Sequence, residues 1–148
     1  MKYIILIVIF SFFLQADTLK EAIQQDHFLS NGQTGFIKYN NKEYLISVGV
    51  SPISDSSIRA KINSIKAAKI IAQRGLTKFI HQVKITSKEE LTSVSIITKD
   101  GEKILRKDNE QFIEIIREES DGILRKIIEI GKWEKDNEYF FALGVEKK

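Results

Sequence analysis

The chain has 148 residues, with 23 lysine and arginine side chains against 20 aspartate and glutamate side chains and a net charge of +3 at pH 7. This near balance gives no indication of the concentrated basic face that nucleic-acid binding usually needs. The absence of cysteine excludes disulfide bridges, thiolate nucleophiles and sulfur-ligated metal sites. The length fits a single domain built around one core.

The first sixteen residues are predicted to be an export signal. A positively charged start is followed by the almost entirely apolar run Ile4–Leu14, and polarity returns at Asp17. These are the features of a secretory signal peptide, and the run is shorter than the roughly 20 residues that a spanning helix needs. We expect cleavage after Ala16, although Leu14 is larger than the cleavage site prefers; a retained inner-membrane anchor is the alternative. Cleavage removes one lysine and no acid, which leaves 22 basic and 20 acidic side chains.

The next segment is predicted to begin with an arm and a hairpin. Residues 17–34 are treated as a loose N-terminal arm with a short helix that ends at Ser30-Asn31-Gly32, because chain termini fray unless they are tied down. Strands are expected at 35–39 and 43–50, joined by Asn40-Asn41, since asparagine tolerates a left-handed backbone.

A long helix follows, with N-capping oxygens at Ser54–Ser56 and an end near His81. Gly75 inside it indicates close packing. Lys69 projects toward the apolar stripe, where it either extends its ammonium group to solvent or serves as a buried functional lysine. The basic residues outside the stripe form a solvated face or contact an acidic surface: lipid headgroups, cell-wall material or a partner protein. The stripe consists of Ile58, Ile62, Ile65, Ala68, Ala72, Leu76, Phe79 and Val83, and the basic residues are Arg59, Lys61, Lys66, Arg74 and Lys78.

The rest of the chain is predicted to alternate strands and a short helix. Val83–Thr86 and Thr92–Lys99 are expected to be extended, with a hairpin turn at Asp100-Gly101. A helix that starts after a capping box at Asp108 and Gln111, and carries Phe112, Ile115 and Ile116, ends near Ser120-Asp121-Gly122. Strands at 123–133 and 139–146 close the chain around a turn at 135–137. The predicted fold is α+β, an antiparallel sheet covered by one long and one shorter helix, with the domain at 35–148.

No catalytic constellation is evident, so we predict a protein that is not an enzyme and that uses no cofactor, metal or small-molecule substrate. His27 and His81 lie in different elements without a carboxylate at a ligand-like spacing, and phosphate-loop and metalloprotease motifs are missing from the sequence. A cell-wall hydrolase is the enzymatic alternative, with the turn aspartates or the pairs Glu89-Glu90 and Glu118-Glu119 as carboxylates. Trp133, Tyr139 and Phe140 are the expected contact residues for docking at the sheet edge. For Trp133 a structural role is the alternative, in which the ring is partly buried and its indole N–H is hydrogen-bonded.

The sequence resembles a bacterial envelope family. Gly49-Val50-Ser51 leads into an alanine-rich helix, and the later pattern ends in a tryptophan and an aromatic strand; this arrangement is similar to the twenty-kilodalton envelope lipoprotein family (Lpp-twenty), whose relatives include FlgP-like flagellar accessory proteins. The resemblance covers roughly residues 43–146. The residues that carry it are Ala60, Ala67, Ala68, Ala72, Leu76, Phe112, Ile115, Ser120, Leu124, Trp133 and Tyr139–Val145.

The resemblance implies a non-enzymatic envelope protein that self-assembles or docks to an outer-membrane lipoprotein, with peripheral outer-membrane association and a role in supporting the flagellar motor. Members of the family commonly carry a lipidated cysteine at the cleavage site, where this chain has Asp17. We therefore expect an unlipidated periplasmic or secreted protein. The docking surface is expected to be a sheet edge, above all that of the last strand, or the outer face of the long helix. A secreted module that binds a host or surface ligand is the alternative function.

Overall fold

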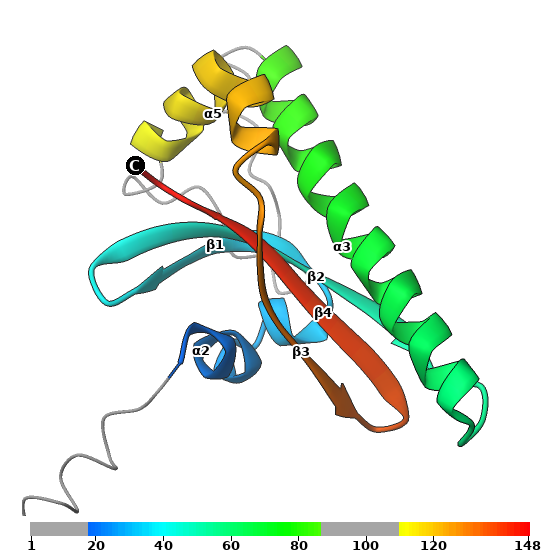
Figure 1. Ribbon diagram of the computed structural model, residues 1–148. Coiled ribbons are helices and arrows are strands. Elements are labelled where there is room, and N and C mark those ends of the chain that lie inside the picture. The colour runs from blue at the N-terminus through cyan, green and yellow to red at the C-terminus, as the bar shows by residue number, and fades with distance from the viewer. Residues whose placement is uncertain (1–17, 87–109) are drawn as a thin grey trace, which may run out of the picture.

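The computed structural model describes residues 18–86 and 110–148 (Figure 1). The predicted signal peptide, the extended segment Thr92–Lys99, the turn at Asp100-Gly101 and the cap at Asp108 lie outside the described residues. The elements are α2 (Leu19–Gln25), the 3-10 helix η1 (Leu29–Asn31), β1 (Thr34–Tyr39), β2 (Lys42–Pro52), α3 (Ile58–Ile85), α5 (Glu110–Leu124), β3 (Ile128–Lys135) and β4 (Glu138–Glu146).

The four described strands form one antiparallel sheet in the order β1-β2-β4-β3, so the predicted α+β class is confirmed. Two tight hairpins build it. Asn40 and Asn41 have φ angles of 49° and 61°, and Asp136 and Asn137 have φ angles of 51° and 63°. Positive φ at both central residues is the mirror-image turn that matches the twist of antiparallel strands, which explains the asparagine and aspartate at these positions.

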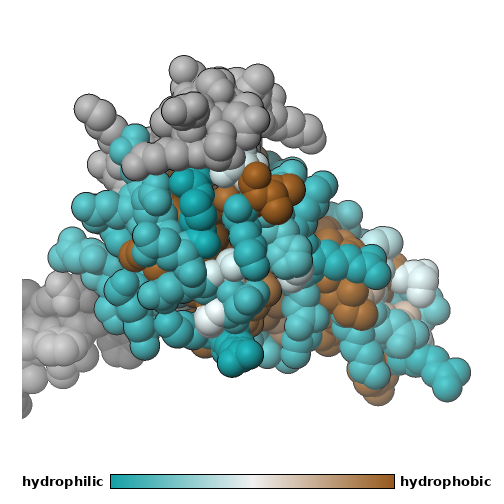
Figure 2. All heavy atoms as spheres, turned by 90° about the horizontal axis from the view of Figure 1, so that it is seen from above, coloured by the Kyte–Doolittle hydropathy of each residue, from teal (hydrophilic) through white to brown (hydrophobic). Residues whose placement is uncertain are grey.

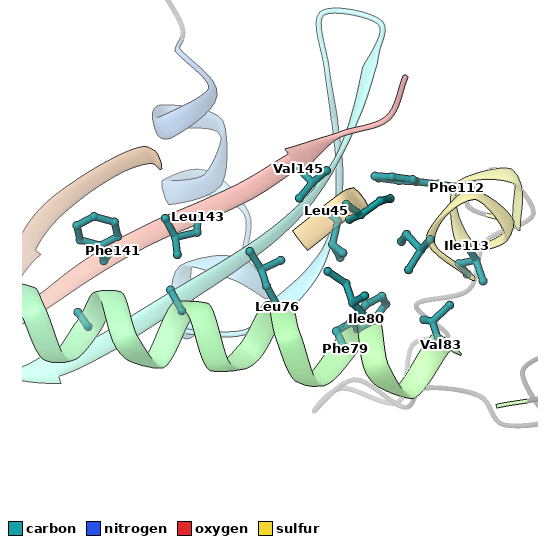
Figure 3. Packing of buried hydrophobic residues seen from close by; sticks show 14 residues of the cluster. Leu45, Leu76, Phe79, Ile80, Val83, Phe112, Ile113, Phe141, Leu143 and Val145 are labelled. Atoms are coloured by element: carbon teal, nitrogen blue, oxygen red, sulfur yellow. The ribbon is translucent and has the colours of Figure 1, made fainter. Parts of the chain in front are cut away.

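One face of the sheet is covered by α3, with α5 packed across the C-terminal end of that helix (Figure 1). The main core lies between these layers. Side chains of α3 point toward the sheet, Phe112 reaches in from α5, and the face of β4 that carries Phe141, Leu143 and Val145 meets them (Figure 3). The ring of Phe112 lies 5.3 Å from that of Phe36 on β1, which connects α5 to the far strand of the sheet.

The contact between α3 and β2 is made by small residues. An added Cβ at Gly49 would lie 1.8 Å from the Ala68 carbonyl oxygen and 2.6 Å from the Ala72 nitrogen, so the helix backbone rests directly on the strand. At Gly75 an added Cβ would lie 2.3 Å from the Ser47 hydroxyl, which confirms the close packing expected there. The Ser64 hydroxyl donates a 2.7 Å hydrogen bond to the carbonyl oxygen of the last β2 residue. The buried row at four-residue spacing is Ala60, Ser64, Ala68, Ala72, Leu76 and Ile80.

This row differs from the predicted stripe at its start. Ile58 is 78% exposed and Ile62 is 45% exposed, so their assignment to the core is wrong. In the first turns the buried positions that face the sheet are occupied by Ala60 and Ser64, which leaves the two isoleucines on the outer side of the helix. Lys69 is exposed, with its ammonium nitrogen 5.6 Å from the centre of the Phe141 ring, which confirms the extended rather than the buried alternative.

Three boundaries also differ from expectation. The N-cap of α3 is Ser57, whose hydroxyl accepts a 3.1 Å hydrogen bond from the Ala60 amide. The helix continues through 83–85, which were expected to be extended, because Val83 is 2% exposed and completes the core. Non-helical backbone at Glu119 interrupts α5 close to the predicted end, yet a further turn extends to Leu124, so β3 starts at 128 rather than 123.

The segment expected to be a loose arm packs against the opposite face of the sheet (Figure 1). A capping box between Thr18 and Glu21 starts α2, and Asp26 accepts hydrogen bonds from two backbone amides at the start of η1. Ile23 and Leu29 are 0% and 1% exposed. They belong to a second core, and their burial holds residues 18–33 against the sheet. The composition of this segment did not predict that packing. The strand residues of that core are Tyr44, Ile46, Val48, Phe140 and Ala142.

We expect Gly49→Ala to lower the free energy of unfolding by about 3 kcal/mol, because the new methyl group meets helix backbone that cannot move alone. Gly122→Ala is the matched control. An added Cβ there meets nothing within 4 Å, so this change in α5 should raise stability by about 0.5 kcal/mol. Urea unfolding followed by circular dichroism measures both. Equal effects of the two substitutions would contradict the close helix-strand contact.

We expect Leu29→Ala to lower the free energy of unfolding by about 2–3 kcal/mol, since a fully buried leucine leaves a cavity. Gln24→Ala, an exposed position on α2, should change it by less than about 0.5 kcal/mol. The same urea titrations compare the two. A Leu29 variant as stable as the parent protein would show that residues 18–33 do not belong to the cooperative fold.

Candidate interaction surface

The hairpin of β3 and β4 carries all three predicted contact residues. Its turn is fixed to the segment before α3: the Ile53 amide donates a 3.0 Å hydrogen bond to the Asn137 carbonyl oxygen, and the Asn137 side-chain amide donates a 3.3 Å bond back to the Ile53 carbonyl oxygen. The hairpin is therefore held at both its strands and its tip, so its side chains have defined positions.

Strand alternation divides the three residues between the two faces of the sheet. Trp133 and Phe140 lie opposite each other in the β3–β4 register and point to the face covered by α2. Tyr139, one residue earlier on β4, points to the face that carries α3. The structure thus brings together Trp133 and Phe140 and separates Tyr139 from them.

The tryptophan and phenylalanine rings stack. Their centroids are 5.3 Å apart and their planes differ by 6°. Phe140 is 7% exposed and belongs to the second core, so it offers almost no surface to a partner, whereas Trp133 is half-buried at the margin of that core. Among the described residues the Trp133 indole N–H has no hydrogen-bond acceptor, although a tryptophan that is even partly buried usually finds one. Trp133 is therefore the aromatic residue that is best placed to meet a partner.

The strand order decides which edges are free. β4 pairs with β2 on one side and β3 on the other, so the expectation that the last strand offers an open edge is wrong. Within the described part of the chain, β1 and β3 are the outer strands. A register shift between Glu129 and Gly131 marks a bulge in β3, and three charged residues flank Trp133. Bulges and charges discourage unselective strand pairing, so only a partner with matching charges would pair here. The charged residues are Lys132, Glu134 and Lys135.

Two electrostatic interactions among the described residues stabilise the fold, one at the start of α3 and one at the end of β4. Hydrogen bonds from the side chain and backbone of Ser57 lower the pKa of Asp55. This interaction supports the start of α3. The most enclosed ion pair joins the Lys147 ammonium to Glu43 at 2.9 Å and fixes the end of β4 to β2.

In the described ranges, 18–86 and 110–148, no group of three or more histidine, aspartate or glutamate side chains could hold a metal ion. His27 and His81 are both exposed, one after α2 and the other on α3. Over those same ranges, no helix combines the length and apolarity that a membrane crossing requires. Comparisons with protein-family models, curated proteins and solved structures found no match. The resemblance to the twenty-kilodalton envelope lipoproteins therefore stays a prediction.

We expect Trp133→Ala to lower the free energy of unfolding by about 1–2 kcal/mol, because the ring is only half-buried and loses one stacking contact. Phe140→Ala is the matched comparison, with an expected loss of about 3–4 kcal/mol from the buried position. Circular dichroism is the readout, since Trp133 is the only tryptophan and its removal abolishes indole fluorescence. Equal losses would make Trp133 a core residue and remove it as a contact candidate.

Proposed function

We propose that this protein is an exported, non-enzymatic component of the cell envelope that acts by docking to a protein partner, either a second copy of itself or an envelope lipoprotein. The observation that carries this proposal is the half-buried Trp133 on the outer strand β3, stacked on Phe140 and without an acceptor for its indole N–H among the described residues. Export is supported by the charged and apolar start of the sequence, which ends at Ala16.

The sheet restricts how a partner can bind. A strand that pairs with β3 would extend the sheet on the side of Trp133, and its side chains would meet the charges of Lys132 and Glu134. Tyr139 would contribute only to a partner that also reaches the α3 face of the sheet. The function therefore depends on β3 and its tryptophan, and not on the last strand, whose two sides are already paired.

The proposal is tested by site-specific photo-cross-linking in cells. A cross-linking side chain at Lys132 should trap a discrete partner, while the same side chain at Lys38, exposed on the opposite outer strand β1, serves as the control. Mass spectrometry of the recovered protein should give a chain that begins at Asp17. Cross-links at Lys38 alone would move the contact to the other edge. A strictly monomeric protein with no adduct at either position would refute docking.

A further inference from the structure

The charged side chains of α3 are all basic. This helix carries seven basic side chains and no acidic one, whereas α5 carries five acidic side chains and one arginine. A helix of 28 residues that has only one sign of charge presents a surface of that sign about 40 Å long. The basic residues of α3 are Arg59, Lys61, Lys66, Lys69, Arg74, Lys78 and Lys84.

A single exposed row on α3, here called the basic–apolar ridge, combines these charges with isoleucines. Its members recur at three- or four-residue spacing, which places them along one side of the helix. All of them are exposed, and the isoleucines at 62 and 70 are 45% and 48% exposed. The buried row that rests on the sheet lies on the other side of the helix, so the ridge points away from the sheet. The ridge consists of Arg59, Ile62, Lys66, Ile70, Arg74 and Lys78.

The charges of the ridge are not used within the described part of the molecule. Lys61 pairs with Glu134 at 3.7 Å and Lys84 with Asp121 at 3.8 Å, but both lie outside the ridge. The four basic residues of the ridge make no ion pair with any described residue. On the right of Figure 2, where α3 extends, hydrophobic residues are exposed among hydrophilic ones. The four cations and two isoleucines of the ridge are thus exposed, and no described acidic residue pairs with the cations.

A shallow hollow lies beside the ridge. Its walls come from α3, from the end of α5 at Leu124 and from Ile127 in the connection to β3, and the last two residues supply apolar surface. Arg74 and Lys78 of the ridge also line it, together with Ile70. Apolar side chains with cations beside them suit a ligand that has an anionic group attached to hydrocarbon.

We propose that the basic–apolar ridge binds the surface of an anionic lipid bilayer. Cationic side chains attract anionic headgroups, and isoleucines between them enter the headgroup–acyl boundary, which is how basic amphipathic helices lie on membranes. The lipid surface is a second partner, in addition to the protein partner of the proposed function. The lipid proposal rests on the proposed function only in placing the protein in the cell envelope. A bilayer surface is fluid and has no fixed shape. A straight ridge can bind such a surface because the contact needs no shape complementarity.

The other partners fit the ridge less well. Two copies that met ridge to ridge would place like charges together. The acidic helix α5 of a second copy supplies charge, but the exposed large hydrophobic residues of the described chain include none on α5, so the isoleucines would find no counterpart. A nucleic acid would neutralise the cations but leave the isoleucines in water. An acidic, apolar protein segment is the remaining competitor, and the experiment distinguishes it.

Flotation of the purified mature chain with vesicles tests the proposal. Binding to phosphatidylcholine vesicles should be weak and should rise when phosphatidylglycerol is added, then fall with salt. The double variant Lys66→Glu, Arg74→Glu should bind at least about tenfold more weakly, since each basic residue near an anionic surface contributes roughly fivefold. Lys132→Glu with Lys135→Glu makes the same change of net charge on β3 and should keep binding. Ile70→Ser should weaken binding without a change of charge.

Three outcomes would overturn the proposal: binding that ignores phosphatidylglycerol, equal losses in the ridge and β3 variants, or capture of an acidic protein through the ridge with no vesicle binding. Circular dichroism of each variant excludes unfolding as the cause. Cross-linking from Lys132 tests docking at β3 separately from lipid binding by the ridge. If it persists in the ridge variant, docking at β3 stands whether or not the ridge binds lipid.

Discussion

The close contact between α3 and β2 at Gly49 is the constraint on which the rest of the structure depends. The helix backbone lies where the Cβ of any other residue would be, with the Ala68 carbonyl oxygen 1.8 Å from that position. Only small side chains can line such a contact, and α3 provides them at four-residue spacing through Ala60, Ser64 and Ala72. This choice also fixes the rotation of the helix, so that Ile62 and Ile70 turn to solvent between basic residues.

The sheet separates two cores of different construction. On the α3 face, large side chains from Leu76 onward fill the space between α3, α5 and the strands (Figure 3). On the opposite face, the cover is short: α2 has seven residues and η1 has three. Ile23 and Leu29 are fully buried, whereas Trp133 at the margin of this core is only half-buried. Trp133 is thus partly exposed because α2 and η1 cover less than the whole face of the sheet beneath them.

Local patterns predicted most of the elements, because each rests on nearby residues. Paired asparagines set one hairpin and Asp136-Asn137 the other, and the apolar spacing of the long helix placed Ala68, Ala72 and Leu76 in the core. The features that local patterns did not predict depend on packing between residues far apart in the chain. The position of β4 inside the sheet depends on pairing with β2 across almost one hundred residues of chain, from Gly49 to Phe141. Hydrophobicity likewise misplaced Ile58, since the helix meets the sheet through small residues. Alanine and serine at four-residue spacing opposite a strand glycine were the signal for that contact.

The two proposed surfaces can act in the same molecule. The ridge on α3 points away from the sheet, while Trp133 lies on the far face, beside α2. A chain that lies on a bilayer through Lys66 and Arg74 would therefore hold Trp133 on the side away from the lipid, accessible to a protein partner. Both elements belong to one packed unit, since α3 and β3 each contact β4. Binding to a membrane would then concentrate and orient the β3 edge, which favours docking by reducing the rotational freedom that association otherwise loses.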